Sequence, residues 1–212
     1  MVNYIYIHVC CINNWKEVFN KLYYNIKTSG LYDIVKSIKC NVLSESNNVI
    51  DFFSGLNDDK LEVVGISNDL SLYETPTINL LYQHSLQEES DFNVLYLHTK
   101  GVKHNNNNIN VNDWIDYLTY FNITKYETCI NYLQDYDAVG VNLQNGNVET
   151  HYSGNFWWTK SQYIKKLTKC EYKNYNSPEF WLTETNTGKY LSLWNSNINH
   201  YSQRYEEHNY KK

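Results

Sequence analysis

Strand-like and helix-like segments alternate from the start of this chain of 212 amino acids. Residues 4–10 are apolar or aromatic at almost every position and rich in β-branched side chains, which is typical of a strand buried on both faces of a parallel sheet. Apolar residues then recur at helical spacing from Trp15 to Ile26, and the pattern stops at Ser29 and Gly30. A strand, a helix and a glycine stop predict the opening of a βαβ unit.

The same alternation continues through the first half of the chain. Further strands are predicted at residues 34–43, 61–66 and 92–97, with a short helical turn at 49–53. A helix is predicted to start with Thr75 as the N-cap and Pro76 as its first residue. Strands that alternate with helices predict an α/β fold whose mostly parallel open sheet is flanked by helices and binds ligands beyond the carboxyl ends of its strands.

The second half of the chain predicts helices and shorter strands. Helices are expected within residues 114–133 and at 161–167, and strands at 138–143 and 151–158. Ser177 and Pro178 are predicted as the N-cap and first residue of another helix, and the asparagine run 105–108 as a polar loop. We therefore expect a single domain over residues 1–212, with a core to about residue 200 and a C-terminal tail at 201–212.

Charge, hydropathy and cysteine usage exclude several classes of protein. The formal net charge is -5 and the sequence contains no basic stripe, which argues against nucleic acid as a partner. No segment approaches the roughly 20 apolar residues that span a membrane, and no secretory signal pattern is present, so we expect a cytoplasmic protein with no transmembrane segment. The 5 cysteines include no C-x-x-C pair, which predicts reduced thiols instead of a disulfide framework.

Three short clusters contain residue types that commonly catalyse reactions or bind ligands. They are residues 97–101 (Leu-His-Thr-Lys-Gly), 152–158 (Tyr-Ser-Gly-Asn-Phe-Trp-Trp) and 178–181 (Pro-Glu-Phe-Trp). In this order, after the βαβ repeats, they resemble GT-A-like glycosyltransferases, in particular short viral and bacterial sequences with an H-T-K-G segment after a central strand. The resemblance runs from Tyr4 to about Tyr201.

The resemblance implies a GT-A-like (Rossmann-like) fold and a hexosyltransferase type of activity in glycan biosynthesis. A sugar would pass from a nucleotide-sugar co-substrate (a UDP-, GDP- or dTDP-sugar) to a hydroxyl acceptor on a glycan or protein glycan. For a viral source, the expected location is the cytoplasm of the host cell. The alternative is a non-catalytic carbohydrate-binding or scaffold module with a degenerate GT-A fold.

The central strand of GT-A enzymes delivers a D-x-D motif that holds a divalent metal against the donor diphosphate. Here that place reads His98-Thr99-Lys100, and this departure from the family pattern predicts a donor site without a metal, in which Lys100 offsets the charge of the leaving diphosphate. His98 and the Gly101 N–H would donate hydrogen bonds, and Thr99 would bind the donor. The alternative is a surface lysine after a strand. A literal D-x-D at residues 135–137 precedes its strand and is interpreted as a loop.

The 152–158 cluster combines aromatic rings with small polar residues. Sugars present apolar C–H faces that stack on aromatic rings, while their hydroxyls need polar partners. We predict Ser153, Gly154, Asn155 and Trp157 as the sugar or acceptor site. The alternative is that the aromatic residues alternate into the core and the glycine allows a tight bend.

Glu179 lies in the first turn of a predicted helix. The resemblance implies that an acidic residue at this place, downstream of a glycine-containing strand and a helix, is the base that deprotonates the acceptor hydroxyl. Favourable electrostatics at a helix start are the alternative explanation of an acid there. Glu179, Lys100 and His98 form the predicted catalytic set.

The resemblance also implies that the loop after the first strand and the residues around the third strand bind the donor nucleotide. These are Cys11, Asn13, Ser67, Asn68 and Asp69. His200 is predicted to fold back over the diphosphate from the C-terminal segment. Polar residues at strand ends are also ordinary loop residues, so the pattern alone leaves both interpretations open.

Overall fold

The computed structural model describes residues 1–46, 48–105, 108–145 and 149–211. Its first half contains the strands and helices that the alternating pattern predicted, together with a short helix, α2 (Leu31–Ile34), that the pattern did not predict and that includes Ile34, the predicted first residue of the second strand. They are β1 (Val2–Cys10), α1 (Trp15–Thr28), α2 (Leu31–Ile34), β2 (Val35–Leu43), α3 (Val49–Gly55), β3 (Leu61–Ser67), α4 (Thr75–Gln87) and β4 (Phe92–His98). Of the predicted asparagine loop, Asn106 and Asn107 lie outside the described residues, as does Lys212 at the end of the predicted tail.

The second half has shorter elements. They are α5 (Ile109–Thr119), a π-helix (Tyr120–Thr124), α6 (Tyr126–Tyr132), β5 (Ala138–Gly140), β6 (Leu143–Gln144), β7 (His151–Tyr152), β8 (Trp157–Lys160), α7 (Ser161–Ile164), α8 (Ser177–Phe180) and β9 (Tyr190–Ser192). Residues 201–211, predicted as a tail, pack onto α5, since the rings of Tyr205 and Tyr210 lie 5.3 Å and 5.2 Å from the Tyr117 ring.

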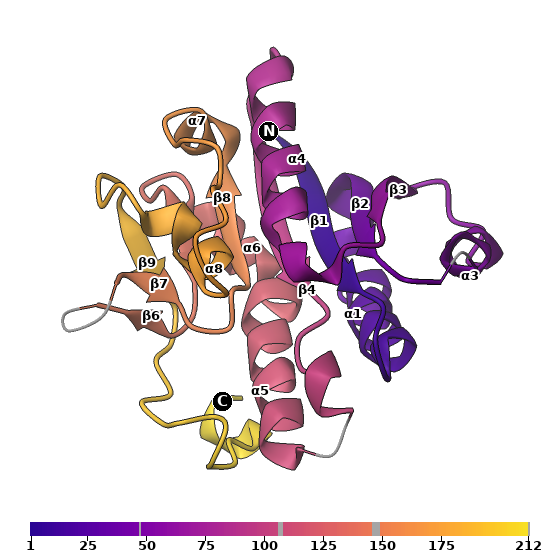
Figure 1. Ribbon diagram of the computed structural model, residues 1–212. Coiled ribbons are helices and arrows are strands. Elements are labelled where there is room, and N and C mark those ends of the chain that lie inside the picture. The colour runs from indigo at the N-terminus through magenta and orange to yellow at the C-terminus, as the bar shows by residue number, and fades with distance from the viewer. Residues whose placement is uncertain (47, 106–107, 146–148, 212) are drawn as a thin grey trace.

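A seven-stranded sheet in the order β3-β2-β1-β4-β8-β5-β9 forms the centre of the molecule (Figure 1). β1 pairs in parallel with β2 and β4, β2 with β3, and β5 with β9, whereas β8 is antiparallel to both β4 and β5. β6 and β7 form a separate two-stranded sheet. The predicted α/β class with a mostly parallel open sheet is therefore confirmed.

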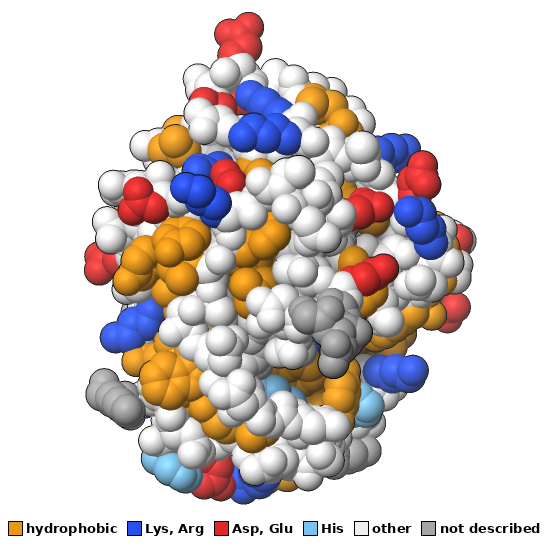
Figure 2. Space-filling model, turned by 90° about the vertical axis from the view of Figure 1, so that its left-hand side faces the viewer, with side chains coloured by type: hydrophobic (Ala, Val, Ile, Leu, Met, Phe, Trp, Pro, Cys, Tyr) orange, Lys and Arg blue, Asp and Glu red, His pale blue; other side chains and the backbone are white. Residues whose placement is uncertain are grey.

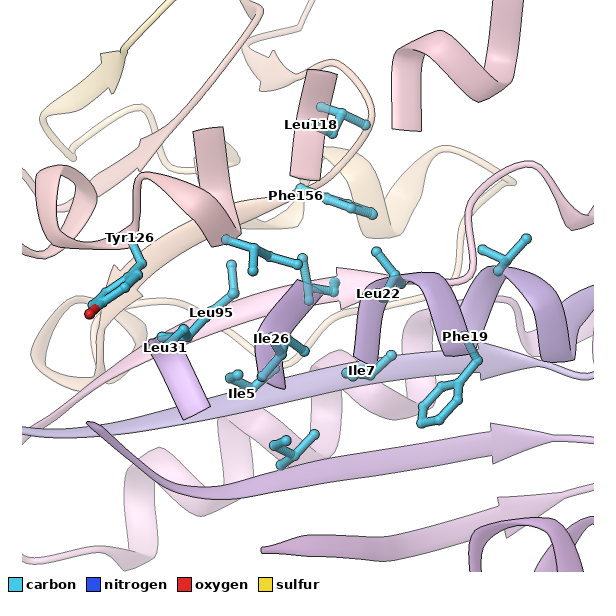
Figure 3. Close-up of a cluster of buried hydrophobic side chains, with 14 of the residues drawn as sticks. Ile5, Ile7, Phe19, Leu22, Ile26, Leu31, Leu95, Leu118, Tyr126 and Phe156 are labelled. Carbon is cyan, nitrogen blue, oxygen red and sulfur yellow. The ribbon is translucent and has the colours of Figure 1, made fainter. Parts of the chain in front are cut away.

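β1 is buried on both faces because helices cover both sides of the sheet. Ile5 and Ile7 pack into one cluster with side chains of α1, α5 and α6 (Figure 3), while Tyr4 and Tyr6 pack on the opposite face against α4. Complete burial of an isoleucine side chain contributes about 1.5–3 kcal/mol to stability. The continuous apolar run of the first strand thus fixes it at the centre of the sheet.

The two strands predicted at residues 138–143 and 151–158 are each interrupted. Asn142 has φ 52°, and the chain leaves β5 there and resumes as β6. Gly154 at φ 100° and Asn155 at φ 53° turn the chain between β7 and β8. Left-handed backbone at these residues breaks the extended conformation that apolar alternation alone predicts.

The predicted helix starts at Thr75 and Ser177 are wrong by one residue, because the N-caps are Glu74 and Asn176. The Thr75 hydroxyl is buried and makes no hydrogen bond with an N–H group of the helix. The Ser177 hydroxyl accepts hydrogen bonds from the backbone N–H groups of residues 173 and 174, so it stabilises the loop before the helix. α7 ends at Ile164, short of the predicted residue 167.

The surface carries charges of both signs. Figure 2 shows one face, on which lysine and arginine side chains are scattered among acidic and uncharged ones. Among the described residues, no helix is both long enough and apolar enough to cross a membrane.

Candidate functional site

A pocket of about 420 Å³ opens at the carboxyl ends of β1 and β4. β1 lies between β2 on one side and β4 on the other, so the parallel strands extend away from this point in both directions. Such a switch point leaves a crevice at the sheet edge where α/β proteins bind ligands. Eighteen residues line the pocket: His8, Cys10, Ile12, Leu70, Ser71, Tyr73, Glu74, His98, Thr99, Lys100, Gly101, Val102, Lys103, His104, Val111, Trp114, Tyr175 and Tyr201.

The segment after β4 forms the floor of the pocket and requires its glycine. Gly101 has φ 83°, and a Cβ atom there would lie 2.7 Å from Val111. Thr99 is buried and ties the ends of the two strands together, because its N–H donates to the His8 carbonyl and its hydroxyl accepts from the Cys10 N–H, both at 3.0 Å. Sequence analysis therefore placed residues 98–101 correctly at the carboxyl edge of the sheet.

Lys100 brings a positive charge into this pocket. Its ammonium lies 3.7 Å from the centre of the Trp114 ring. Burial lowers the pKa of Lys100, while the charges of Glu179 and Glu74 act in the opposite direction. Within the described residues no carboxylate comes within ion-pair distance of this ammonium, so the cation is held by an aromatic face and remains available to an anion.

Two neutral histidines stand beside it. Burial lowers the pKa of His8 to about 4 and, together with the Lys100 charge, that of His98 to about 3. The His98 Nε2 lies 3.0 Å from the Gly154 carbonyl oxygen, which only accepts, so Nε2 carries the proton and donates. The free Nδ1 of His98 is then an acceptor, whereas sequence analysis expected His98 to donate a hydrogen bond into the site.

Glu74 is a pocket residue that sequence analysis did not single out. Its Oε2 accepts hydrogen bonds from the Tyr96 hydroxyl at 2.7 Å and from the Asn155 Nδ2 at 2.6 Å, and its Oε1 lies 3.6 Å from the His98 Nδ1. The sequence signal was the acid directly before Thr75-Pro76, at a helix start that faces the carboxyl edge of the sheet.

The turn between β7 and β8 joins this carboxylate to the second half of the chain. Asn155 donates to Glu74 and accepts at its Oδ1 from the Trp157 Nε1 at 2.7 Å. Trp157 is only 1% exposed and stacks on Tyr96 with ring centres 4.7 Å apart, so its indole belongs to the core. Its contribution to the site is to hold Asn155. The indole is too deeply buried to contact a sugar, contrary to the prediction.

Gly154 and Glu179 meet on the same turn. The Gly154 N–H donates to the Glu179 Oε1 at 3.1 Å, and a Cβ on Gly154 would lie 2.7 Å from Leu118. The neighbouring Ser153 N–H donates to the Asn142 carbonyl at 3.0 Å, which anchors the turn. The predicted sugar cluster, the predicted base and His98 are therefore connected through one turn.

The residues predicted to bind the donor nucleotide lie around the pocket but do not line it. The Cys11 N–H donates to Leu43, the Asn13 amide donates to Val102, and Asp69 accepts from the Ser71 N–H. Ser67 ends β3, and Asn68 follows it. Leu70 and Ser71, directly after this group, do line the pocket.

His200 lies behind the pocket wall. Its ring stacks on Trp114 with centres 4.9 Å apart and planes 7° apart, and its Nε2 lies 2.8 Å from the Ser196 hydroxyl. The side chain is 4% exposed. His200 thus packs against the Trp114 ring that contacts Lys100. Its side chain is too deeply buried to contact a diphosphate, contrary to the prediction.

Exposed tyrosines surround the mouth of the pocket. Tyr73, Tyr175 and Tyr201 are 37%, 62% and 56% exposed, and the rings of Tyr73 and Tyr175 lie 4.9 Å apart at nearly right angles. Flat aromatic surfaces at a pocket mouth suit a nucleobase or the apolar face of a sugar.

Carboxylate, imidazole and thiol groups are the side chains that could hold a divalent metal. Among the described residues, no three His, Cys, Asp or Glu side chains form a group that could hold a metal ion. Asp135 and Asp137 precede β5 at the edge of the sheet opposite the pocket, and Asp137 accepts from the Lys189 N–H.

Comparison with known proteins gives a family and a fold. Residues 33–208 match the model of the family described as "Domain of unknown function (DUF8361)". The chain belongs to this family. No curated protein matches the sequence.

Solved structures similar to this DUF8361 chain share only its fold. HddC from Yersinia pseudotuberculosis has 15% identity and a TM-score of 0.50, with 92% of this chain and 91% of HddC covered. TarS residues 1–349 from S. aureus have 12% identity and a TM-score of 0.53, with 91% of this chain and 58% of TarS covered. The 4-diphosphocytidyl-2C-methyl-D-erythritol synthase from Anaerococcus prevotii DSM 20548 has 10% identity and a TM-score of 0.50, with 91% and 86% covered. The similarity supports the predicted GT-A-like (Rossmann-like) α/β fold.

Proposed function

We propose that this protein transfers a sugar from a nucleotide-sugar to a hydroxyl acceptor at the pocket between β1 and β4. The observation that carries the proposal is the half-buried Lys100 at the switch point of a GT-A-like sheet, whose ammonium has no described carboxylate within ion-pair distance. Such a cation suits the diphosphate of a nucleotide-sugar, and the tyrosine rim suits its base or sugar.

The chemistry follows from the charges in the pocket. The acceptor oxygen forms a bond to the anomeric carbon of the donor sugar, and the bond from that carbon to the diphosphate breaks with its electron pair on the phosphate oxygen. Lys100 stabilises the negative charge that develops there. Glu179 does not line the pocket itself, but its carboxylate accepts from the Gly154 N–H on the turn that also holds His98, and the acceptor proton passes to this carboxylate.

The first experiment tests the donor site. Isothermal titration calorimetry with UDP, GDP and dTDP, each with Mn²⁺ and with EDTA, is compared for wild type, Lys100→Met and Lys166→Met. Lys166 is exposed and lies just after α7, which follows the end of β8. The end of β8 pairs with the start of β4, so Lys166 lies at the edge of the sheet opposite the pocket and serves as a control. We expect one nucleotide to bind in EDTA and to lose about tenfold or more in affinity in Lys100→Met alone. Binding that strictly requires Mn²⁺ contradicts the role given to Lys100.

The second experiment tests turnover. A screen for hydrolysis of nucleotide-sugars detects donor cleavage even without the acceptor. We expect Glu179→Gln to lose turnover while it retains donor binding, since the amide cannot accept the proton. Unchanged turnover in this variant removes Glu179 as the base. Thermal stabilisation by glycans alone, with no response to nucleotide-sugars, supports a carbohydrate-binding module instead.

A further inference from the structure

Glu74 and His98 present two hydrogen-bond acceptors to the pocket. The Glu74 Oε1 and the His98 Nδ1 are 3.6 Å apart, and both residues line the cavity. The side chains are 20% and 14% exposed, so a ligand in the pocket can reach them. Two facing acceptors need hydrogen atoms from a third group, because neither can donate to the other.

The acceptor character of His98 follows from its other nitrogen. The Nε2 donates to the Gly154 carbonyl, and burial beside Lys100 lowers the pKa of the imidazole to about 3, so the ring is neutral with a lone pair on Nδ1. The contact with Glu74 is therefore not an ion pair.

The acceptor character of the Glu74 Oε1 follows from the occupation of Oε2. The Tyr96 hydroxyl and the Asn155 amide both donate to Oε2, and within the described chain no hydrogen bond ends on Oε1. Asn155 is itself held by the Trp157 Nε1 and by left-handed backbone at φ 53°. The carboxylate is thus fixed with one oxygen bound to the frame and the other directed toward His98.

We propose that Glu74 and His98 together bind two adjacent hydroxyl groups of the sugar carried by the nucleotide-sugar, an inference that rests on the proposed function. Neighbouring hydroxyls on a sugar ring supply two O–H donors side by side, which matches two acceptors at this spacing. The Lys100 ammonium lies over the Trp114 ring, 3.7 Å from its centre, and binds the diphosphate of the same ligand. The site therefore favours sugars whose adjacent hydroxyls are both free and disfavours those with a deoxy or substituted position there.

Glu74→Gln is a nearly isosteric test of this pair. An amide oxygen at the place of Oε2 keeps the hydrogen bonds from Tyr96 and Asn155, and the amide NH₂ then takes the place of Oε1 and donates toward the His98 Nδ1. The variant therefore keeps the frame and removes both free acceptors at once. Glu127→Gln on the exposed side of α6 is the matched control.

The assay is calorimetry on the full chain with UDP, GDP and dTDP and with UDP-glucose, GDP-mannose and dTDP-glucose. The measured quantity is the ratio of the Kd of each nucleoside diphosphate to the Kd of its sugar conjugate. It is compared at low and high salt, because the free diphosphate carries one more negative charge than the conjugate and salt screens the effect of the Glu74 charge on it. We expect this ratio to fall about tenfold or more in Glu74→Gln and to stay unchanged in Glu127→Gln, as for the loss of a hydrogen bond to a charged group.

Free sugars separate this inference from the proposed function. Methyl glucoside and its monodeoxy derivatives are titrated and followed by NMR in wild type and Glu74→Gln. If no nucleotide binds but methyl glucoside binds through Glu74, and two adjacent deoxy derivatives lose affinity, the proposed function fails and the hydroxyl site stands. If nucleotides bind through Lys100 but the ratio of the two Kd values is unchanged in Glu74→Gln, water alone donates hydrogen bonds to Glu74 and His98. The inference is then overturned. It is also overturned if neither nucleotide-sugars nor glycosides depend on Glu74.

Discussion

Asp58→Asn should destabilise the protein strongly, although Asp58 looks like an ordinary turn residue in the sequence. Its side chain is only 2% exposed. The carboxylate accepts hydrogen bonds from the Tyr23 hydroxyl, the Tyr32 hydroxyl at 2.6 Å, the Lys60 N–H at 2.9 Å and the Lys27 ammonium at 3.0 Å. These contacts join α1, α2 and the start of β3 through one carboxylate.

The magnitude follows from this geometry. Asparagine keeps one accepting oxygen and directs an NH₂ group at donors that previously met the second oxygen. Hydrogen bonds to a charged group contribute about 1.5–3 kcal/mol each, the contact with the half-exposed Lys27 contributes less, and removal of one partner from a buried charged network costs about 3–5 kcal/mol. We expect a loss of about 3 kcal/mol in the free energy of unfolding, which lowers Tm by roughly 6–12 °C for a chain of this size.

The pH dependence gives a second check. Burial alone would raise the pKa of Asp58, but the hydrogen bonds from Tyr23, Tyr32 and Lys60 outweigh it and hold the pKa well below its usual range. A depressed carboxyl pKa stabilises the fold fully above the unfolded pKa of about 3.9. This stabilisation starts to be lost as the pH approaches that value and is lost completely only as the pH falls through the lower pKa of the folded state. The difference between wild type and Asp58→Asn should therefore shrink between about pH 5 and pH 3.

Urea unfolding of wild type, Asp58→Asn and Asp59→Asn at several pH values between about 3 and 7 measures this effect. Asp59 is the exposed neighbour in the same turn and should change stability by less than about 0.5 kcal/mol. Equal losses in the two variants, or a loss in Asp58→Asn that does not depend on pH, would refute the reasoning.

Two further predictions concern the pocket and its support. Gly101→Ala should cost about 1–3 kcal/mol and weaken nucleotide binding, because its φ is positive and the new Cβ meets a side chain, while Gly55→Ala, with no atom within 4 Å, should be neutral or stabilising in the same thermal melts. Burial lowers the pKa of His200 to about 4, so the unfolded chain binds a proton there below about pH 6.5 when the folded chain does not. Urea unfolding should therefore show wild type losing about 1 kcal/mol more than His200→Gln between pH 7.5 and pH 5.5, and equal losses would contradict the burial of a neutral imidazole.

The fold was predictable where strands are buried on both faces and helices follow them. The continuous apolar runs of β1 and β4 read directly as central strands, and they place His98 and Lys100 at the carboxyl edge. The breaks at Asn142 and Asn155 were missed, because left-handed backbone at asparagine leaves no trace in apolar alternation. The two helix starts were missed by one residue, because Glu74 and Asn176 begin their helices without a capping hydrogen bond from the side chain, so the pattern of capping residues does not mark them.

The sequence predicted several residues of the site, such as His98 and Lys100, but it did not predict Glu74, which links them to the Asn155 turn. Glu74 is separated from His98 by 24 residues in sequence, and only the packing of α4 against the sheet brings the two together. Conversely, Trp157 and His200 have the right composition for ligand contact but are buried behind Asn155 and Trp114. The viral type, the cytoplasmic location and the roles of the site residues stay predictions.

The insertion of β8 between β4 and β5 has a consequence for how the molecule is made. β1 to β4 are complete early in synthesis, yet β4 keeps an open edge until Trp157–Lys160 has emerged and paired. An unpaired central strand is a hazard for association between nascent chains, so ribosome-bound intermediates shorter than about residue 160 should depend on chaperones. β8 also places the Asn155 turn against Glu74. The pocket can therefore take its final arrangement only after synthesis has passed about residue 160.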